Sequence, residues 1–113
     1  MTNREVEIIN LTPHEITVVA SNGDVLMKIP ASGNVARCSV SRTVIGKLNG
    51  IPVAKSVMGQ VESMPEPKEG VVFIVSRVVA EALKGVRDDL IIPDDSVRDA
   101  EGKIIGCKGF AVV

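Results

Sequence analysis

The sequence contains no tryptophan and no tyrosine, and only two of its 113 residues are phenylalanine. Proteins that bind single-stranded nucleic acid stack the bases on aromatic rings, so this chain lacks the side chains for that mode of binding. It also has no run of lysine and arginine that would neutralise several phosphates, and its formal net charge is -1. We therefore expect no nucleic-acid partner.

Long apolar runs are also absent. No stretch reaches the roughly 18 apolar residues that a membrane-spanning helix needs. The first ten residues, MTNREVEIIN, are charged and contain no apolar region typical of a secretory signal. These absences predict a cytoplasmic protein without a membrane partner.

Cysteine and histidine are scarce, with only Cys38, Cys107 and His14. Two cysteines do not form a disulfide framework, and we interpret them as buried free thiols, with a single Cys38–Cys107 bridge as the alternative. A lone histidine has too few partners nearby for a metal cluster. No G-x-S-x-G, H-E-x-x-H or C-x-x-C motif occurs. The sequence therefore predicts no metal site and no cofactor, and it assigns no catalytic residue.

The residues that are abundant favour β-structure. The chain contains 19 valines and 11 isoleucines, and β-branched side chains are stiff and suit a pleated, half-buried surface. Its length is typical of one domain, so we expect residues 1–113 to form a single domain. The mean hydropathy of +0.27 is high for so small a chain. A domain of this size leaves much of its surface exposed, so some apolar surface should need a partner to cover it. We therefore expect a homo-oligomer.

Turn residues separate the chain into strand-like segments. The segment 15–29 is expected to be a hairpin around Asn22-Gly23, and 35–45 alternates as one long strand. The segment 51–63 is interpreted as a strand pair with a bulge near Gly59, and 89–93 as a short strand ended by proline. Further strands are expected at 6–10 and 71–75, and the segments 96–99 and 103–113 are expected to form a hairpin with glycine at its turn.

One segment has helical character. Ser76 follows the apolar run VVFIV and is a favoured N-cap, and Gly85 is a favoured residue just past a helix end. The spacing predicts a short helix near residues 77–84, whose inner face would carry Val78, Val79, Ala82 and Leu83. The predicted fold is therefore α+β, sheet-dominated and mostly antiparallel, with a barrel-like closure of the sheet left open.

The stretch RDDLIIPDDSVRDAEGKIIGC, residues 87–107, is rich in aspartate. Carboxylates could hold Mg²⁺ or Ca²⁺, but the spacing does not match the EF-hand loop. Aspartate also starts turns for local reasons, and Arg87 and Arg98 could pair with the neighbouring acids. A solvated rim of turns is the preferred interpretation, with an Arg–Asp network or a metal site as alternatives.

Candidate ligand-binding residues are His14, Ser76, Arg77, Arg87, Arg98 and Asp99. Free amides at the start of the predicted helix would attract a small anion or a nucleotide, and Arg77 would add positive charge there. The usual phosphate-binding glycines are missing, so an ordinary capped helix is the competing interpretation. His14 would be the base if it paired with a cysteine or an aspartate. Its simpler interpretation is as part of the turn that begins the first hairpin.

Several motifs in order resemble a family of small proteins encoded in bacterial genomes and prophages. They are N-L-T-P-H at 10–14, P-x-S-G-x-V-A-R at 30–37, I-V-S at 74–76, and R-D followed by G-x-I-I-G-C within 87–107. The resemblance covers most of the chain, and Cys38 departs from its pattern. The family has no established activity, so the resemblance transfers no catalytic residue. It implies an accessory role encoded by a mobile element.

Three hypotheses for the function follow from these patterns. The leading one is a non-enzymatic accessory or binding protein that acts through self-assembly or a protein partner. The second is a binder of a small anion or nucleotide at the helix start with Arg87 and Arg98. The third is a hydrolase-like enzyme that uses His14.

Overall fold

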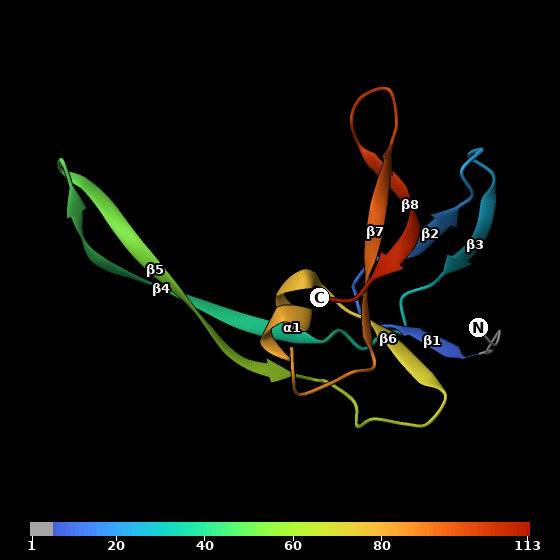
Figure 1. Ribbon diagram of the computed structural model, residues 1–113, viewed down its shortest axis with the longest axis horizontal. Helices are drawn as coiled ribbons and strands as arrows, with labels where there is room; N and C mark the ends of the chain where they lie inside the picture. The colour runs from blue at the N-terminus through green and yellow to red at the C-terminus, as the bar shows by residue number, and fades with distance from the viewer. Residues whose placement is uncertain (1–5) are drawn as a thin grey trace.

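The computed structural model describes residues 6–113, and this part of the chain forms eight β-strands and one α-helix (Figure 1). The elements are β1 (Glu7–Asn10), β2 (Ile16–Val19), β3 (Val25–Ile29), β4 (Arg37–Leu48), β5 (Ile51–Glu62), β6 (Val71–Ile74), α1 (Arg77–Ala82), β7 (Leu90–Arg98) and β8 (Ile104–Ala111). Six strands form one sheet in the order β1-β6-β7-β8-β2-β3, while β4 and β5 pair only with each other. The longest ladders, β4–β5 and β7–β8, are antiparallel, which confirms the predicted sheet-dominated α+β class.

Parallel pairing is confined to short ladders. Strand β6 lies between β1 and β7 and runs parallel to both, with α1 as the crossover from β6 to β7. The apolar run from Val71 to Ile74 is continuous because β6 has paired neighbours on both edges and side chains covered on both faces. Strand β2 also runs parallel to β8, but the two are joined through the single pair Val18–Cys107.

The six-stranded sheet separates two apolar clusters. The larger includes Leu11, Phe73, Val75 and Val79, and the smaller consists of Val18, Ile29, Ile74 and Cys107. The sheet curves far enough that Ala31, just after β3, bridges to Asn10 at the end of β1. Strands β3 and β1 do not pair along their length, so these residues form no closed barrel.

Helix α1 begins where the sequence predicts and ends at Ala82, two residues early. The Oγ atom of Ser76 accepts a hydrogen bond from the Val79 amide at 3.3 Å, which confirms the N-cap. The buried face agrees with the prediction at Val79, which is buried, and at Leu83, which packs against the larger cluster, but Ala80 is buried in place of Val78, which is 40% exposed. Val78, Val79 and Ala80 are consecutive apolar residues, so spacing alone could not choose among them. Within residues 6–113, no helix has the length and apolarity needed to cross a membrane.

Strand β7 does not end at Pro93 as the sequence predicted, but continues to Arg98. Its pairing with β6 stops at Ile91, and beyond that point only the edge facing β8 is paired. Proline cannot donate a hydrogen bond to a sheet and is therefore tolerated where one edge of the strand is free. The tertiary arrangement thus removes the penalty that made proline a predicted strand end.

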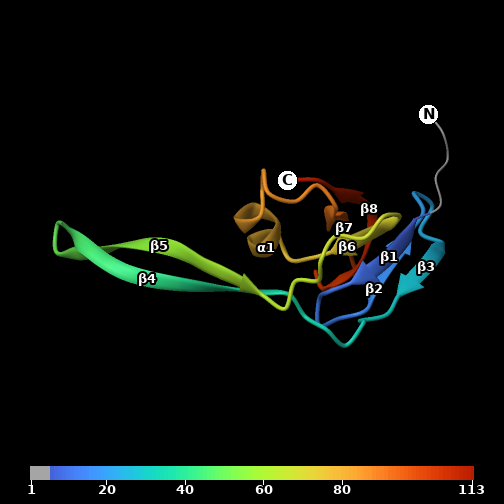
Figure 2. The same cartoon turned by 90° about the horizontal axis from the view of Figure 1, so that it is seen from below.

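The β4–β5 hairpin projects from the body as a long arm, as both cartoon views show (Figures 1 and 2). The Cα radius of gyration is 17.1 Å, whereas a compact chain of this length has about 13 Å. The segment 51–63 is therefore one strand of this arm and not the predicted strand pair. The expected bulge is present, since the register shifts between the pairs Cys38–Val61 and Val40–Met58, which enclose Gly59.

Both cysteines are free, as predicted, but only Cys107 is buried, whereas Cys38 is half-buried. Cys107 is buried in the smaller apolar cluster, and Cys38, at the base of the arm, packs against the larger one. Because the sheet lies between the two clusters, the alternative of a Cys38–Cys107 bridge does not describe this fold.

Candidate functional site

The N-L-T-P-H segment is organised by the side chain of Asn10, which is only 1% exposed. Its Nδ2 donates to the carbonyl oxygens of His14 at 2.7 Å and Ile29 at 3.1 Å. Its Oδ1 accepts from the amide and the hydroxyl of Thr12 at 2.9 and 2.6 Å. One buried amide group therefore ties the end of β1 to the chain before β2 and to the end of β3.

The contribution of His14 to this network is its backbone carbonyl, and the residue itself is exposed. It lines the same cleft as Cys107, one of the candidate nucleophiles. Burial, however, raises the pKa of the Cys107 thiol. A nucleophilic cysteine needs a lowered pKa to be a thiolate near neutral pH, so this pair has the opposite tuning.

Replacing His14 by alanine should change the free energy of unfolding by less than about 0.5 kcal/mol, because an exposed side chain is removed while the bonded carbonyl remains. Urea denaturation followed by circular dichroism measures this. A loss above 1 kcal/mol would show that the imidazole itself has a structural role. Thr12→Val, which removes a hydroxyl bonded to Asn10, is the comparison and should cost about 1 kcal/mol.

The predicted anion site at the start of α1 is not assembled as expected. Ser76 uses its hydroxyl as the helix cap, and the cavity of about 300 Å³ beside it is lined by Leu11, Thr12 and Pro13 and by the base of the arm. Arg77 forms an exposed ion pair with Glu81 at 3.3 Å. Neither Arg87 nor Arg98 lines that cavity.

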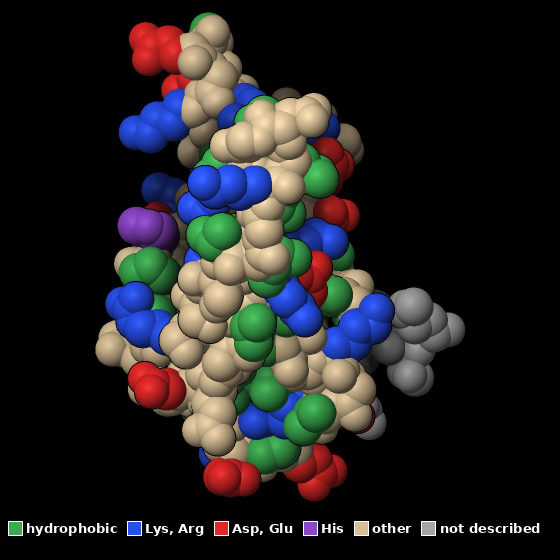
Figure 3. All heavy atoms as spheres, turned by 90° about the vertical axis from the view of Figure 1, so that its left-hand side faces the viewer, with side chains coloured by type: hydrophobic (Ala, Val, Ile, Leu, Met, Phe, Trp, Pro, Cys, Tyr) green, Lys and Arg blue, Asp and Glu red, His purple; other side chains and the backbone are tan. Residues whose placement is uncertain are grey.

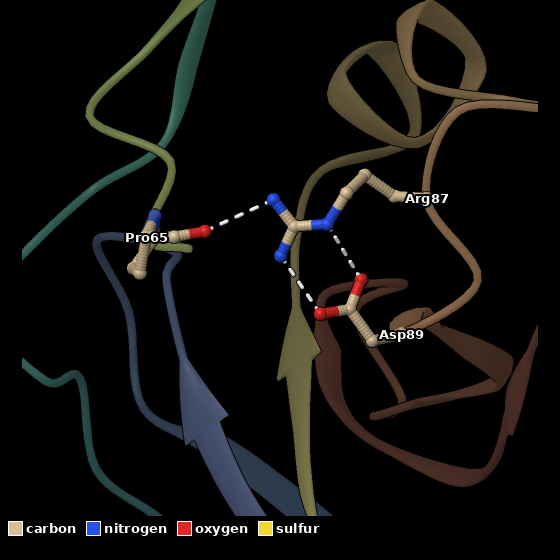
Figure 4. A network of polar contacts seen from close by, with 3 residues as sticks. All are labelled: Pro65, Arg87 and Asp89. Carbon is tan, nitrogen blue, oxygen red and sulfur yellow. Dashed lines mark hydrogen bonds and ion pairs between the residues drawn. The ribbon is translucent and has the colours of Figure 1, made fainter. Parts of the chain in front are cut away.

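Arg87 instead forms a structural pair with Asp89 (Figure 4). Its Nε and Nη2 donate to the two carboxylate oxygens of Asp89 at 2.9 and 2.7 Å, and its Nη1 donates to the carbonyl of Pro65 at 2.9 Å. Both side chains are only 13% exposed, and the guanidinium carbon lies 5.9 Å from the centre of the Phe73 ring. The hydrogen bonds from Arg87 lower the pKa of Asp89. This arrangement is the Arg–Asp network that the sequence analysis held as an alternative for the acidic stretch.

Arg98 is the last residue of β7, and Asp99 begins the turn to β8. Arg98 donates to the carbonyl of Gly102 at 2.7 Å, and the Asp99 carboxylate accepts from the amides of Glu101 and Lys103. No three or more metal-ligating side chains gather in the part of the chain that the structure describes. The six predicted site residues thus have separate, mostly local partners, and the structure does not unite them in one site.

The most distinctive surface is one that the sequence analysis did not single out, the distal part of the arm at residues 39–60. Its exposed apolar side chains are Val40, Val44, Ile45, Leu48, Ile51, Val57 and Met58. Residues that pair across an antiparallel ladder share a face, and successive residues alternate. Along β5, Met58 and Ile51 are seven positions apart and so lie on opposite faces. Their β4 partners Val40 and Leu48 do the same, because the register shifts between Val44 and Gly46, so both faces of the arm are apolar and open.

The signal for this arm is present in the sequence. Asn49 and Gly50 have φ values of 50° and 78°, as a two-residue hairpin turn requires, and Asn-Gly is the dipeptide that favours it. The expected long strand 35–45 precedes this turn, and the segment 51–63, which was expected to be a strand pair, follows it as the single strand β5. What the sequence does not show is that the outer part of the ribbon they form leaves its apolar side chains exposed.

The arm is also basic. Residues 39–60 contain Arg42, Lys47 and Lys55 and no acidic residue, so the segment carries +3. Because the whole chain carries -1, the remainder carries -4. In the space-filling view toward the arm, hydrophobic and basic side chains lie next to one another on the surface that faces the viewer (Figure 3).

On the far side of the body lies the cleft that His14 and Cys107 line, with a volume of about 560 Å³. It opens between β2 and β8, which are paired only at Val18–Cys107. Its apolar walls include Ile16, Ile104 and Ile105, and the last two are each 53% exposed. This volume is in the range of cavities that bind small molecules or side chains of a partner.

A comparison of the chain with protein-family models, curated proteins and solved structures finds no match.

Proposed function

We propose that this protein is a non-enzymatic accessory or binding protein that acts through self-assembly, with the β4–β5 arm as its contact surface. The observation that carries the proposal is the exposure of apolar side chains on both faces of a protruding two-stranded ribbon. An isolated two-stranded hairpin is marginally stable in water, and apolar surface of this kind marks protein contacts. Binding of a partner protein would stabilise the hairpin and would bury its apolar surface.

A second copy of the chain is the partner we propose. Strands of 12 residues reach about 40 Å, and a ribbon about 10 Å wide offers roughly 800 Å² over its two faces. That is about the area one partner contributes to a stable interface. The arm carries +3 and the rest of the chain -4, so the charge that complements the arm is present on the same protein.

The setting of this function is part of the proposal. The resemblance of the N-L-T-P-H and G-x-I-I-G-C motifs to a bacterial and prophage family supports an accessory role in the cytoplasm, encoded by a mobile element. The absence of nucleic-acid-binding features in the sequence agrees with a role through protein contacts.

Size-exclusion chromatography with light scattering tests self-assembly. The wild-type chain of 12.0 kDa should elute as an oligomer at micromolar concentration, and Val44→Ser/Ile45→Ser should shift it toward the monomer. Both side chains are more than 60% exposed, so the variant should keep the melting temperature of the monomeric body. A wild-type protein that stays monomeric at high concentration would refute the proposal.

A further inference from the structure

We infer that the tip of the arm of one copy inserts into the β2–β8 cleft of a second copy. The inference rests on the proposed self-assembly and names the two surfaces that meet. The tip presents Leu48 and Ile51 as a cross-strand pair on one face, and they are 69% and 66% exposed. An aliphatic anchor that enters a pocket can form the buried centre of a protein interface.

The cleft has the complementary shape and chemistry. Ile16, Ile104 and Ile105 provide apolar walls, and the volume of about 560 Å³ is sufficient for two aliphatic side chains. Strands β2 and β8 pair only at Val18–Cys107 and separate toward the start of β8. The β8 edge at Ile104–Ile105 therefore has no pairing partner on β2. The cleft is thus an unfilled gap in the sheet.

Charge selects arm-to-body contact over contact between two arms. Two arms would bring Arg42, Lys47 and Lys55 of each copy together, and like charges across an interface are unfavourable. Around the cleft, Glu15 lines the wall, and Asp94 and Asp95 follow the lining residue Pro93. Lys103 also lines the wall, Lys108 follows the lining residue Cys107, and Lys28 pairs across from Thr17, so the charges around the cleft balance. The opposite charge that the basic tip meets is the net -4 of the chain outside the arm.

The contact has to be intermolecular. The arm leaves the body on the side opposite to β2, β3 and β8 in both cartoon views, so the tip points away from the cleft of its own chain (Figures 1 and 2). Each copy therefore offers one tip and one cleft. Two copies can exchange arms as a closed dimer, or several can form a ring.

Three matched double variants test the contact. Leu48→Ser/Ile51→Ser removes the tip, and Ile104→Ser/Ile105→Ser removes the cleft walls. Val25→Ser/Leu26→Ser removes two exposed side chains of β3 that lie outside the cleft, and it serves as the control. The tip and cleft variants should each weaken assembly at least about thirtyfold, the effect of losing one anchoring side chain, while the control assembles as wild type.

A mixture of the tip variant and the cleft variant gives the decisive readout. The tip variant keeps an intact cleft and the cleft variant an intact tip, so the two should form a 1:1 pair by light scattering although neither associates alone. If the cleft variant assembles as wild type, or if the mixture stays monomeric, the cleft is not where the tip docks, and self-assembly through the arm still stands. A monomeric wild type refutes the proposed function itself.

Discussion

Asn10→Ala is expected to lower the free energy of unfolding by about 3 kcal/mol, one of the largest effects for any substitution in this chain. The Asn10 side chain is 1% exposed and satisfies the carbonyls of His14 and Ile29 and the amide of Thr12. Removing it leaves these backbone groups unpaired away from water, at about 1–3 kcal/mol for each buried group. Urea denaturation followed by circular dichroism measures the loss.

Asn10→Asp keeps the size of the side chain but replaces its NH2 donor by a carboxylate oxygen, so it tests the contribution of the hydrogen bonds alone. The new carboxylate would face two carbonyl oxygens that need a donor, and burial would raise its pKa. A raised pKa in the folded state means that folding favours the protonated form, so the deficit of this variant should shrink as the pH falls toward 4. Asn22→Ala, in an exposed turn, is the matched control and should cost less than 1 kcal/mol. An Asn10→Ala variant as stable as that control would contradict the role assigned to the buried amide.

Arg87→Ala is expected to cost about 3 kcal/mol as well, because it leaves the Asp89 carboxylate and the Pro65 carbonyl without their donor. Removing one member of a buried ion pair is costly since the remaining charge stays desolvated. Arg87→Lys should recover only part of the loss, because an ammonium group cannot form the two-pronged contact. The measurement is again the free energy of unfolding in urea.

Arg77→Ala is the matched control for Arg87. Arg77 also pairs with an acid, but the side chains of Arg77 and Glu81 are 70% and 44% exposed. Ion pairs in water contribute little, so this change should cost less than about 0.5 kcal/mol. Equal losses in the two variants would show that burial does not distinguish these pairs.

The pH dependence of stability gives an independent reading of the Arg87–Asp89 pair. Arg87 lowers the pKa of Asp89 in the folded state, so the pair stabilises the fold above the unfolded-state pKa of about 3.9. This contribution is lost as the pH falls through the lowered folded-state value. Asp89→Asn should therefore flatten the decline of stability below about pH 4, and a decline unchanged from wild type would assign it to other carboxylates.

Much of the local structure could be predicted because its cause is local. Asn22-Gly23 and the alternation around it specify the β2–β3 hairpin, and Ser76 caps the helix through an amide three residues away. The apolar run at Val71–Val75 identified a buried strand before its neighbours were known. These signals lie within a few residues, where turn geometry and side-chain period act directly.

The candidate site was less predictable, because its contacts join residues that are far apart in the sequence. The partners of Arg87 include Pro65, 22 residues away, and Asn10 reaches Ile29 across 19 residues. The predicted site residues are charged or polar, whereas the most exposed interaction surface is apolar. Leu48 and Ile51 are aliphatic, like the residues of the core, so their exposure could not be predicted from the sequence pattern.

The α+β class, the Asn-Gly turns and the start of the helix were predictable, because β-branched residues, Asn-Gly pairs and a capping serine act over short range. The position of β2 beside β8, of Pro93 within a strand, and of β4 and β5 as an arm outside the sheet follows from long-range packing. Strand order depends on which apolar faces bury one another across the whole chain. The same choice of apolar contacts left the outer part of the arm uncovered. The proposed function therefore rests on a surface and not on a motif.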